Sequence, residues 1–509
     1  MSQNNNFFEL IQQQILESSQ KTFLELHDSH LISFADVNRL SAQLANKLNE
    51  LGLQPGDRIT AQVDKSAQAV LLYLACIRAG LIFHPLNTAY TLKELDYFLE
   101  DAQPTLFVCG SKRADEATEL TGKHKIQLVE TLEANGTGTL CEDIADYDEH
   151  FETVVRDGND TALLIYTSGT TGKPKGAMIT HENISSNAAS LSQVWGWQKS
   201  DVLLHVLPIF HVHGLCVALH IPLLMGTKIL FQPRFSVTET IRLLPQSTVM
   251  MAVPTIYTRL LSDVEFKKDV CDGMRLFVSG SAPLLPETFT QFEQRTGHRI
   301  LERYGMSEAQ MITSNPLHGV RRGGTVGFPL PGVEVRVCDD DGRPLECGEV
   351  GALEIKGPNV FRGYWCNPAA TKSTFREDGY FITGDVARID EAGVVTIVGR
   401  EKDLIISAGF NIYPSEIEFH INQIPLVSDS AVFGVPHPDL GEGVVAAVIR
   451  QSDRLSKLQI REFLEKNLSA FKIPRHIVFV EAFPRNAMGK IEKNRLRESY
   501  RSIFSDESL

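Results

Sequence analysis

Apolar and polar residues alternate with two different periods along the first 150 positions. Leu40, Leu44, Leu48 and Leu51 recur at the spacing of one helix face, which predicts an amphipathic helix over 34–51. The same pattern predicts strands over 58–63 and 105–109 and a helix over 67–79. Strands that alternate with helices are typical of a largely parallel sheet with helices on its faces.

Apolar strands followed by polar turns continue beyond residue 150. We predict strands over 161–167, 248–253 and 275–279 and a helix over 177–192. From residue 333 the pattern changes to short alternating strands separated by Asp/Gly turns, which is typical of antiparallel pairing. These strands are predicted over 333–337, 351–356, 386–390 and 394–398.

A compact segment follows residue 400. We predict helices over 415–424 and 456–468 and strands over 428–435 and 444–450. The expected fold is therefore α/β, with a large N-terminal domain over 1–400 and a small, mobile α+β domain over 401–509. The large domain is expected to contain two α/β subdomains and a β-barrel-like subdomain.

The composition narrows the range of partners. A formal net charge of −14 disfavours nucleic acid and anionic membrane surfaces, which both require a basic face. The longest apolar region, 202–231, is interrupted by four histidines, a lysine and two prolines. It is therefore predicted to form a buried strand, turn and helix rather than a membrane span.

The cysteines and the N-terminal residues predict a compartment. None of the eight cysteines forms a C-x-x-C pair, so reduced thiols in the core are the expected state. Residues 1–20 lack the basic start and apolar core of a signal peptide. Both features predict a cytoplasmic protein.

The strongest local signal is the loop Thr167-Ser-Gly-Thr-Thr-Gly-Lys-Pro-Lys-Gly176, which follows an apolar strand. Backbone N–H groups, hydroxyls and ammonium groups at this density can wrap a polyphosphate. The spacing does not fit a Walker A loop, G-x-x-x-x-G-K-[ST]. The loop alone predicts nucleotide binding.

Five further motifs follow this loop in order, and together they extend over residues 167–490. They are Ser279-Gly-Ser-Ala-Pro283, Tyr304-Gly-Met-Ser-Glu308, Thr383-Gly-Asp385, Gly399-Arg-Glu-Lys-Asp-Leu-Ile405 and Pro484-Arg-Asn-Ala-Met-Gly-Lys490. On these residues the chain resembles the acyl-adenylate-forming superfamily of acyl-CoA synthetases, peptide-synthetase adenylation domains and luciferases. The resemblance implies an ATP-dependent ligase that forms an acyl-adenylate and then a thioester with coenzyme A.

The resemblance also assigns roles within the site. Residues that it assigns to ATP or AMP binding are Thr167, Ser168, Gly169, Thr170, Thr171, Gly172, Lys175, Ser281, Ala282, Pro283, Glu302, Arg303, Tyr304, Gly305, Met306, Ser307, Asp385 and Arg400. Within this set Tyr304 is expected to stack on adenine, and Asp385 with Arg400 to hold the ribose. Glu308, together with Thr167, is expected to bind Mg²⁺, which prefers oxygen ligands.

Lys490 and His211 are the other expected catalytic residues. The reaction gathers negative charge as a carboxylate attacks the α-phosphate, so the site must supply cations. By resemblance, Lys490 bridges the carboxylate and the α-phosphate, and His211 lines the acyl or thiol side of the pocket. Asp403 resembles a hinge about which the small domain rotates between the two steps.

Coenzyme A is the expected thiol substrate. By resemblance, Ala408, Gly409 and Phe410 enter the site in the second step, and Lys472 lies where basic residues meet the coenzyme A phosphates. Arg475 has the same expected role. A peptide-synthetase module would need a carrier domain after residue 509. We expect none there, which favours free coenzyme A as the acceptor.

Malonyl-CoA synthetases are the group that the chain resembles over most of its length. The supporting stretches are Leu207-Pro-Ile-Phe-His-Val-His-Gly214, Leu276–Leu284, Glu302–Glu308 and Gly409–Glu416. A dicarboxylate needs a cation for its second carboxylate. Arg234, with Ser281 and Met306, is the expected carboxylate site, while Arg303 is a second residue that could contact substrate.

Other functions remain open at this point. The nearest is a coenzyme A ligase for another short-chain or aromatic acid. A non-catalytic sensor of ATP or acyl-adenylate is the alternative from a different class, and the presence of Lys490, Glu308 and Asp385 disfavours it. His213 is equally compatible with a substrate contact and with a buried structural histidine.

Overall fold

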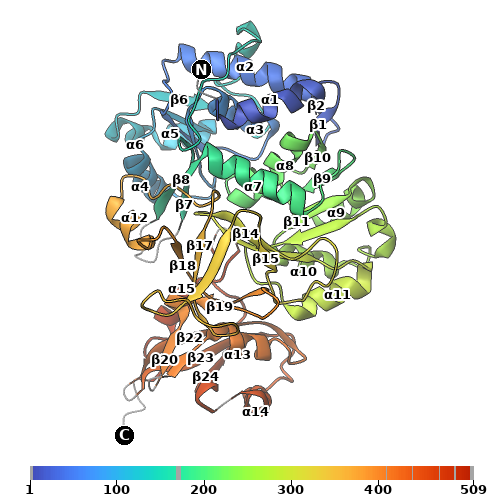
Figure 1. Ribbon diagram of the computed structural model, residues 1–509, viewed down its shortest axis with the longest axis vertical. Coiled ribbons are helices and arrows are strands. Elements are labelled where there is room, and N and C mark those ends of the chain that lie inside the picture. The colour runs from blue at the N-terminus through green and yellow to red at the C-terminus, as the bar shows by residue number, and fades with distance from the viewer. Residues whose placement is uncertain are drawn as a thin grey trace.

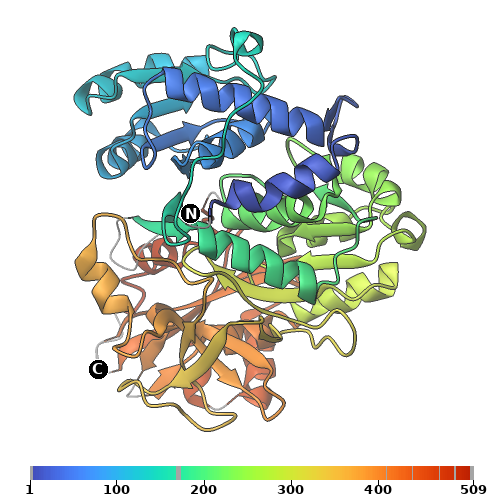
Figure 2. The same cartoon turned by 45° about the horizontal axis from the view of Figure 1, so that its top comes forward.

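The computed structural model describes residues 4–167, 174–407, 410–437, 440–468, 470–486 and 489–504. The chain builds four sheets, and three of them belong to the first 400 residues. Figure 1 shows the C-terminal segment below these three sheets, and Figure 2 shows the N-terminal helices on the opposite side. The predicted α/β architecture is confirmed.

The first α/β unit is a six-stranded sheet in the order β6-β5-β3-β4-β7-β8. All its pairs are parallel except β7 with β8. The strands are β3 (Arg58–Gln62), β4 (Ile82–Pro85), β5 (Leu106–Cys109), β6 (Leu128–Thr131), β7 (Thr161–Thr167) and β8 (Lys175–Thr180). Its helices are α2 (Phe34–Glu50), α3 (Ala67–Arg78), α4 (Leu92–Ala102), α5 (Ser111–Glu116) and α6 (Thr118–Lys123).

The second α/β unit is a nine-stranded sheet in the order β15-β14-β13-β12-β11-β9-β10-β1-β2. Its strands are β1 (Thr22–Leu26), β2 (Leu31–Ser33), β9 (Val202–His205), β10 (Lys228–Phe231), β11 (Val249–Ala252), β12 (Leu276–Ser279), β13 (Leu301–Met306), β14 (Gln310–Ser314) and β15 (Phe328–Pro329). Its helices are α1 (Phe7–Glu17), α7 (His181–Val194), α8 (Ala218–Met225), α9 (Val237–Leu243), α10 (Pro254–Leu261) and α11 (Pro286–Thr296). Six neighbouring strands of this sheet pair in parallel, in the order β13-β12-β11-β9-β10-β1, so their carboxyl ends meet at one edge.

The remaining sheets are smaller. The segment expected to be barrel-like forms a four-stranded antiparallel sheet of β16 (Glu334–Cys338), β17 (Gly351–Lys356), β18 (Phe381–Ile389) and β19 (Val395–Arg400), with helix α12 (Pro368–Thr374). The C-terminal sheet contains β20 (Ile405–Ser407), β21 (Phe410–Ile412), β22 (Val427–His437), β23 (Gly441–Arg450) and β24 (His476–Phe479). Its helices are α13 (Pro414–Ile421), α14 (Lys457–Asn467) and α15 (Lys493–Ser499). Apolar residues of this segment pack into cores of their own.

One predicted helix begins later than its pattern suggested. Residues 175–180 form β8, which pairs antiparallel with β7, and the helix begins at His181. Thr180 caps the helix by accepting the backbone N–H of Asn183 at 3.2 Å. The strand forms because β7 offers an open edge, which local periodicity does not reveal.

The apolar region 202–231 forms β9, a π-helical turn over His213–Val217, α8 and β10, as predicted. Within the described ranges, no helix is both long and apolar enough to cross a membrane.

Candidate active site

A carboxylate and two hydroxyls meet where β7 ends. The Thr167 hydroxyl donates to Glu308 Oε1 at 3.0 Å, and the Tyr364 hydroxyl donates to the same oxygen at 3.1 Å. Glu308 is buried, and its carboxylate and the Thr167 hydroxyl are the ligand types that Mg²⁺ prefers. These residues therefore fit the expected metal. Tyr364 belongs to none of the six motifs, so the sequence did not point to it.

The phosphate loop follows this point directly. Its residues Ser168, Gly169, Thr170, Thr171 and Gly172 lie outside the described residues. Lys175 begins β8, and its ammonium lies 5.1 Å from the centre of the Tyr364 ring. The described end of the loop is thus adjacent to the Glu308 carboxylate.

Three residues predicted to hold the nucleoside come together around Asp385. The Tyr304 hydroxyl donates to Asp385 Oδ2, and Arg400 Nε lies 3.1 Å from Oδ1. Asp385 is buried, while Arg400 is half-exposed. Burial, followed by the negative charge of Asp385, raises the pKa of Tyr304 well above its ordinary value. A fixed carboxylate of this kind can accept hydrogen bonds from ribose hydroxyls.

A buried arginine lies at the end of the parallel strands. Arg303 is only 3% exposed, and its Nε and Nη2 have no partner among the described residues. The guanidinium packs on Gly280, where an added Cβ would lie 2.4 Å from Arg303 Cζ. Burial lowers the pKa of Arg303 well below its ordinary value. A buried cation without a partner is costly, and an anionic ligand would compensate for it.

Two neutral histidines border this arginine. His213 Nδ1 lies 3.3 Å from the Ser281 hydroxyl, and Ser281 has a left-handed φ of 71° in the turn after β12. Burial lowers the pKa of His213 well below its ordinary value, and the charge of Arg303 lowers it further. Burial lowers the pKa of His211 to about 3, with a further contribution from Lys490. We call Arg303, Ser281, His211 and His213 the acid pocket.

Several other predicted residues lie at the same strand ends. They are Ala282 and Pro283 in the turn after β12, Gly305 and Met306 at the end of β13, and Ser307 just beyond it. Glu302 has a different position. Its carboxylate accepts the backbone N–H groups of Gly324 at 3.0 Å and Leu284 at 3.2 Å, so it ties two loops together. Burial raises its pKa to about 7.

Lys490 reaches the site from the C-terminal segment. A tight turn presents it, in which Gly489 donates its N–H to the Asn486 carbonyl at 2.8 Å and Lys490 donates its own to Asn486 Oδ1 at 3.0 Å. Burial lowers the pKa of Lys490 to about 8, and the charges of Arg400, Asp385 and Arg303 act on it as well. The ammonium is therefore within electrostatic range of both the nucleoside residues and Arg303.

Arg234, the expected carboxylate partner, is not brought into the acid pocket. Its side chain is 85% exposed and lies 3.7 Å from Asp64 Oδ1. A carboxylate held there would remain in water, where an ion pair contributes little. Burial depends on tertiary packing, and the sequence could not distinguish this arginine from Arg303.

The residues expected to form the hinge and to bind coenzyme A belong to the C-terminal segment. Arg497 Nη2 donates to the Asp403 carboxylate at 3.2 Å. Phe410 is half-exposed and stacks on Phe471 at 4.6 Å, whereas Ala408 and Gly409 lie outside the described residues. Lys472 Nζ contacts both oxygens of Glu416, at 2.7 and 2.8 Å. Its charge is therefore compensated in this arrangement.

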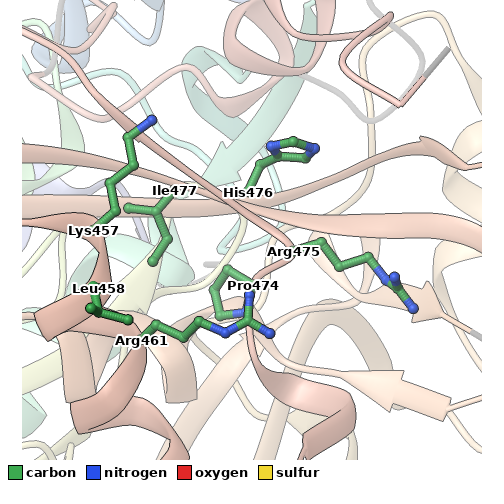
Figure 3. A pocket seen from close by; sticks show the side chains of 7 residues that line it. All are labelled: Lys457, Leu458, Arg461, Pro474, Arg475, His476 and Ile477. Atoms are coloured by element: carbon green, nitrogen blue, oxygen red, sulfur yellow. The ribbon is translucent and has the colours of Figure 1, made fainter. Parts of the chain in front are cut away.

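A basic hollow of about 300 Å³ lies on the C-terminal segment, between α14 and β24 (Figure 3). Its lining residues are Lys457, Leu458, Arg461, Pro474, Arg475, His476 and Ile477. The lining contains no carboxylate and combines cations with apolar side chains. Such a surface suits an anion that carries an apolar or planar group.

Comparisons with known proteins agree with this geometry. The family model described as AMP-binding enzyme matches residues 11–365, and the AMP-binding enzyme C-terminal domain matches residues 416–490. A malonate–CoA ligase of Arabidopsis thaliana is 35% identical over 90% of this chain and 80% of its own length. ATP-bound MatB from Rhodopseudomonas palustris is 47% identical, with a TM-score of 0.96, over 99% of this chain and all of the other.

The apo structure of that same protein superposes less closely, with a TM-score of 0.86 at the same identity and coverage. The present arrangement of the chain is thus closer to the ATP-bound structure of that protein than to its apo structure. On the matched family models and on these relatives, the chain belongs to the AMP-binding enzyme family.

Proposed function

We propose that this protein is an AMP-forming ligase that joins malonate to coenzyme A. The observation that carries the proposal is Arg303, a buried guanidinium whose Nε and Nη2 have no partner among the described residues and whose charge acts on Lys490. Arg303 would bind the second carboxylate of malonate while Lys490 bridges the first carboxylate and the α-phosphate. The names of the compared proteins support the same acid.

The first step forms malonyl-adenylate. A carboxylate oxygen of malonate attacks the α-phosphorus of ATP, and pyrophosphate leaves with its bonding electrons. Lys490 stabilises the charge that develops between the two anions. Mg²⁺, held by Glu308 and Thr167, would neutralise phosphate charge. Asp385 and Arg400 would fix the ribose, so that the α-phosphate faces the acid.

The second step forms the thioester. The coenzyme A sulfur attacks the acyl carbon, AMP leaves as the phosphate, and the thiol proton is released to solvent. For this step we propose that residues 401–509 rotate about Asp403 relative to residues 1–400. Rotation would withdraw Lys490, bring the segment that contains Phe410 into the site, and free Lys472 to meet coenzyme A phosphates with Arg475.

We also propose a cytoplasmic location. All eight cysteines are free thiols in the structure, which fits a reducing compartment. Fractionation of the source cells tests this location, and recovery of the protein with an organelle would contradict it.

A panel of acids tests the proposed reaction. The kcat/KM for AMP formation with ATP and coenzyme A should be highest with malonate and next highest with methylmalonate. It should be lower with oxalate, succinate, acetate, butyrate and coumarate. A preference for any monoacid would contradict the role of Arg303. Absence of turnover with every acid would instead favour a sensor.

A further inference from the structure

A buried hydrogen-bond relay crosses the seam between the two α/β units. Lys65 lies in the loop between β3 and α3, and its ammonium contacts His205 Nδ1 and the His205 carbonyl, each at 2.9 Å. His205 ends β9, and its Nε2 lies 2.9 Å from the Gly214 carbonyl. The ammonium also lies 4.3 Å from the centre of the Phe231 ring. None of the motifs includes Lys65 or His205.

The chemistry of this relay permits one arrangement of protons. The Gly214 carbonyl can only accept, so His205 Nε2 must carry the hydrogen. Burial lowers the pKa of both Lys65 and His205 well below their ordinary values, and the charge of Lys65 lowers the pKa of His205 further, so the ring is neutral. Nδ1 then holds a lone pair and accepts from Lys65. The lysine thus selects the imidazole tautomer that donates to Gly214.

Gly214 connects the relay to the acid pocket. It is the second residue of the π-helical turn His213–Val217, and His213 is the first. Gly214 is also tightly packed, because an added Cβ would lie 1.9 Å from the Pro208 carbonyl oxygen. Fixing the Gly214 carbonyl therefore fixes the main chain that carries His213, whose ring contacts Ser281 at 3.3 Å. π-helical turns frequently occur at functional sites.

We propose that Lys65 is a positioning residue that acts through His205 and Gly214 to hold His213 and Ser281 in place for the acid. Lys65 does not touch the substrate in this account. The inference rests on the proposed function, since it assigns the acid pocket to malonate. It adds that a loop residue of the first α/β unit controls how well the second α/β unit binds the acid.

Steady-state kinetics of Lys65→Met test the inference. The substitution keeps most of the side-chain volume but removes the donor. The KM for malonate should rise by roughly 10- to 100-fold, the effect expected on loss of a hydrogen bond to a charged group. The KM for ATP should change by less than twofold, because the nucleoside residues are not part of the relay. Lys65→Arg, which keeps a cationic donor, should restore a large part of the acid affinity.

Lys47→Met is the matched control. Lys47 is a buried lysine, and its hydrogen bonds within the described residues go to the carbonyls of Thr139 and Glu142, which lie outside the acid pocket. This variant should lose thermal stability while both KM values stay the same. Equal changes of both KM values in Lys65→Met, or no change in the KM for malonate, would overturn the inference.

Two further arms keep the result decisive. If Lys65→Met does not fold, Lys65→Ala replaces it, because alanine also removes the donor to His205. An acid KM equal to that of the unmodified protein would then overturn the inference. The acid panel is measured first on the unmodified protein. Absence of a malonate preference there refutes the proposed function, whereas an unaltered acid KM in the variants refutes only the relay.

Discussion

Replacing Arg303 by methionine separates the acid pocket from the nucleotide site. In the unliganded protein the substitution removes a buried charge without a partner, so the Tm should stay the same or rise. In the complex it leaves the second carboxylate of malonate buried without a cation. That loss costs about 3–5 kcal/mol, which lowers kcat/KM for malonate by roughly 10²- to 10³-fold.

The assay is coupled AMP formation at varied malonate and varied ATP. The KM for ATP should remain within about threefold, because Arg303 takes no part in the Thr167–Glu308 contact or in the contacts of Asp385 with Tyr304 and Arg400. Turnover of butyrate should increase. Arg234→Met is the matched control, since that arginine is 85% exposed and its removal should change malonate kinetics less than about twofold. Malonate turnover that survives in Arg303→Met, or a loss of comparable size in the control, would refute the assignment.

Three other predictions follow from the same geometry. Burial lowers the pKa of Lys490 to about 8, and its ammonium is the active form, so kcat/KM for ATP should fall above about pH 8. Lys490→Arg should lose this decrease at alkaline pH, whereas a flat profile to pH 10 in the unmodified protein would contradict the catalytic role of Lys490. Arg497→Ala removes the 3.2 Å contact to Asp403, the expected hinge residue, and should slow pyrophosphate exchange by about two- to fivefold without slowing thioester formation from preformed adenylate. Equal effects on both half-reactions would show that this contact does not favour the arrangement used for adenylation. Gly280→Ala places a Cβ 2.4 Å from Arg303 Cζ, so the KM for malonate should rise at least about tenfold while the KM for ATP changes little. A normal malonate KM would show that the Arg303 guanidinium is not held against Gly280.

The order of strands and helices was largely predictable because it follows from local periodicity. The strand over 161–167 was predicted with its observed bounds, and the helix over 34–51 ends within one residue of its predicted end. The helix expected from residue 177 was wrong in its first turn, because Lys175–Thr180 pairs with β7 instead. Pairing partners lie far apart in the sequence, and periodicity carries no information about them.

In the candidate site, too, local sequence predicted some features and distant contacts decided others. Motifs singled out Asp385, Tyr304 and Glu308 because their residue types recur in a fixed order. In the structure Tyr304 donates to Asp385, and Thr167 donates to Glu308. The tight turn at Gly489 likewise presents Lys490 to the site. These residues needed only their sequence context to be found.

The sequence by itself therefore determined the class of fold, the family and the residues expected to bind ATP. Only the tertiary structure decided which arginine is buried at the strand ends, because Arg234 and Arg303 differ in burial and not in chemistry. It also joined Lys65 to His205 across the seam between two sheets. Burial and unpaired hydrogen-bonding groups are properties of the packed chain, since the cost of an unpartnered charge arises only after water is excluded.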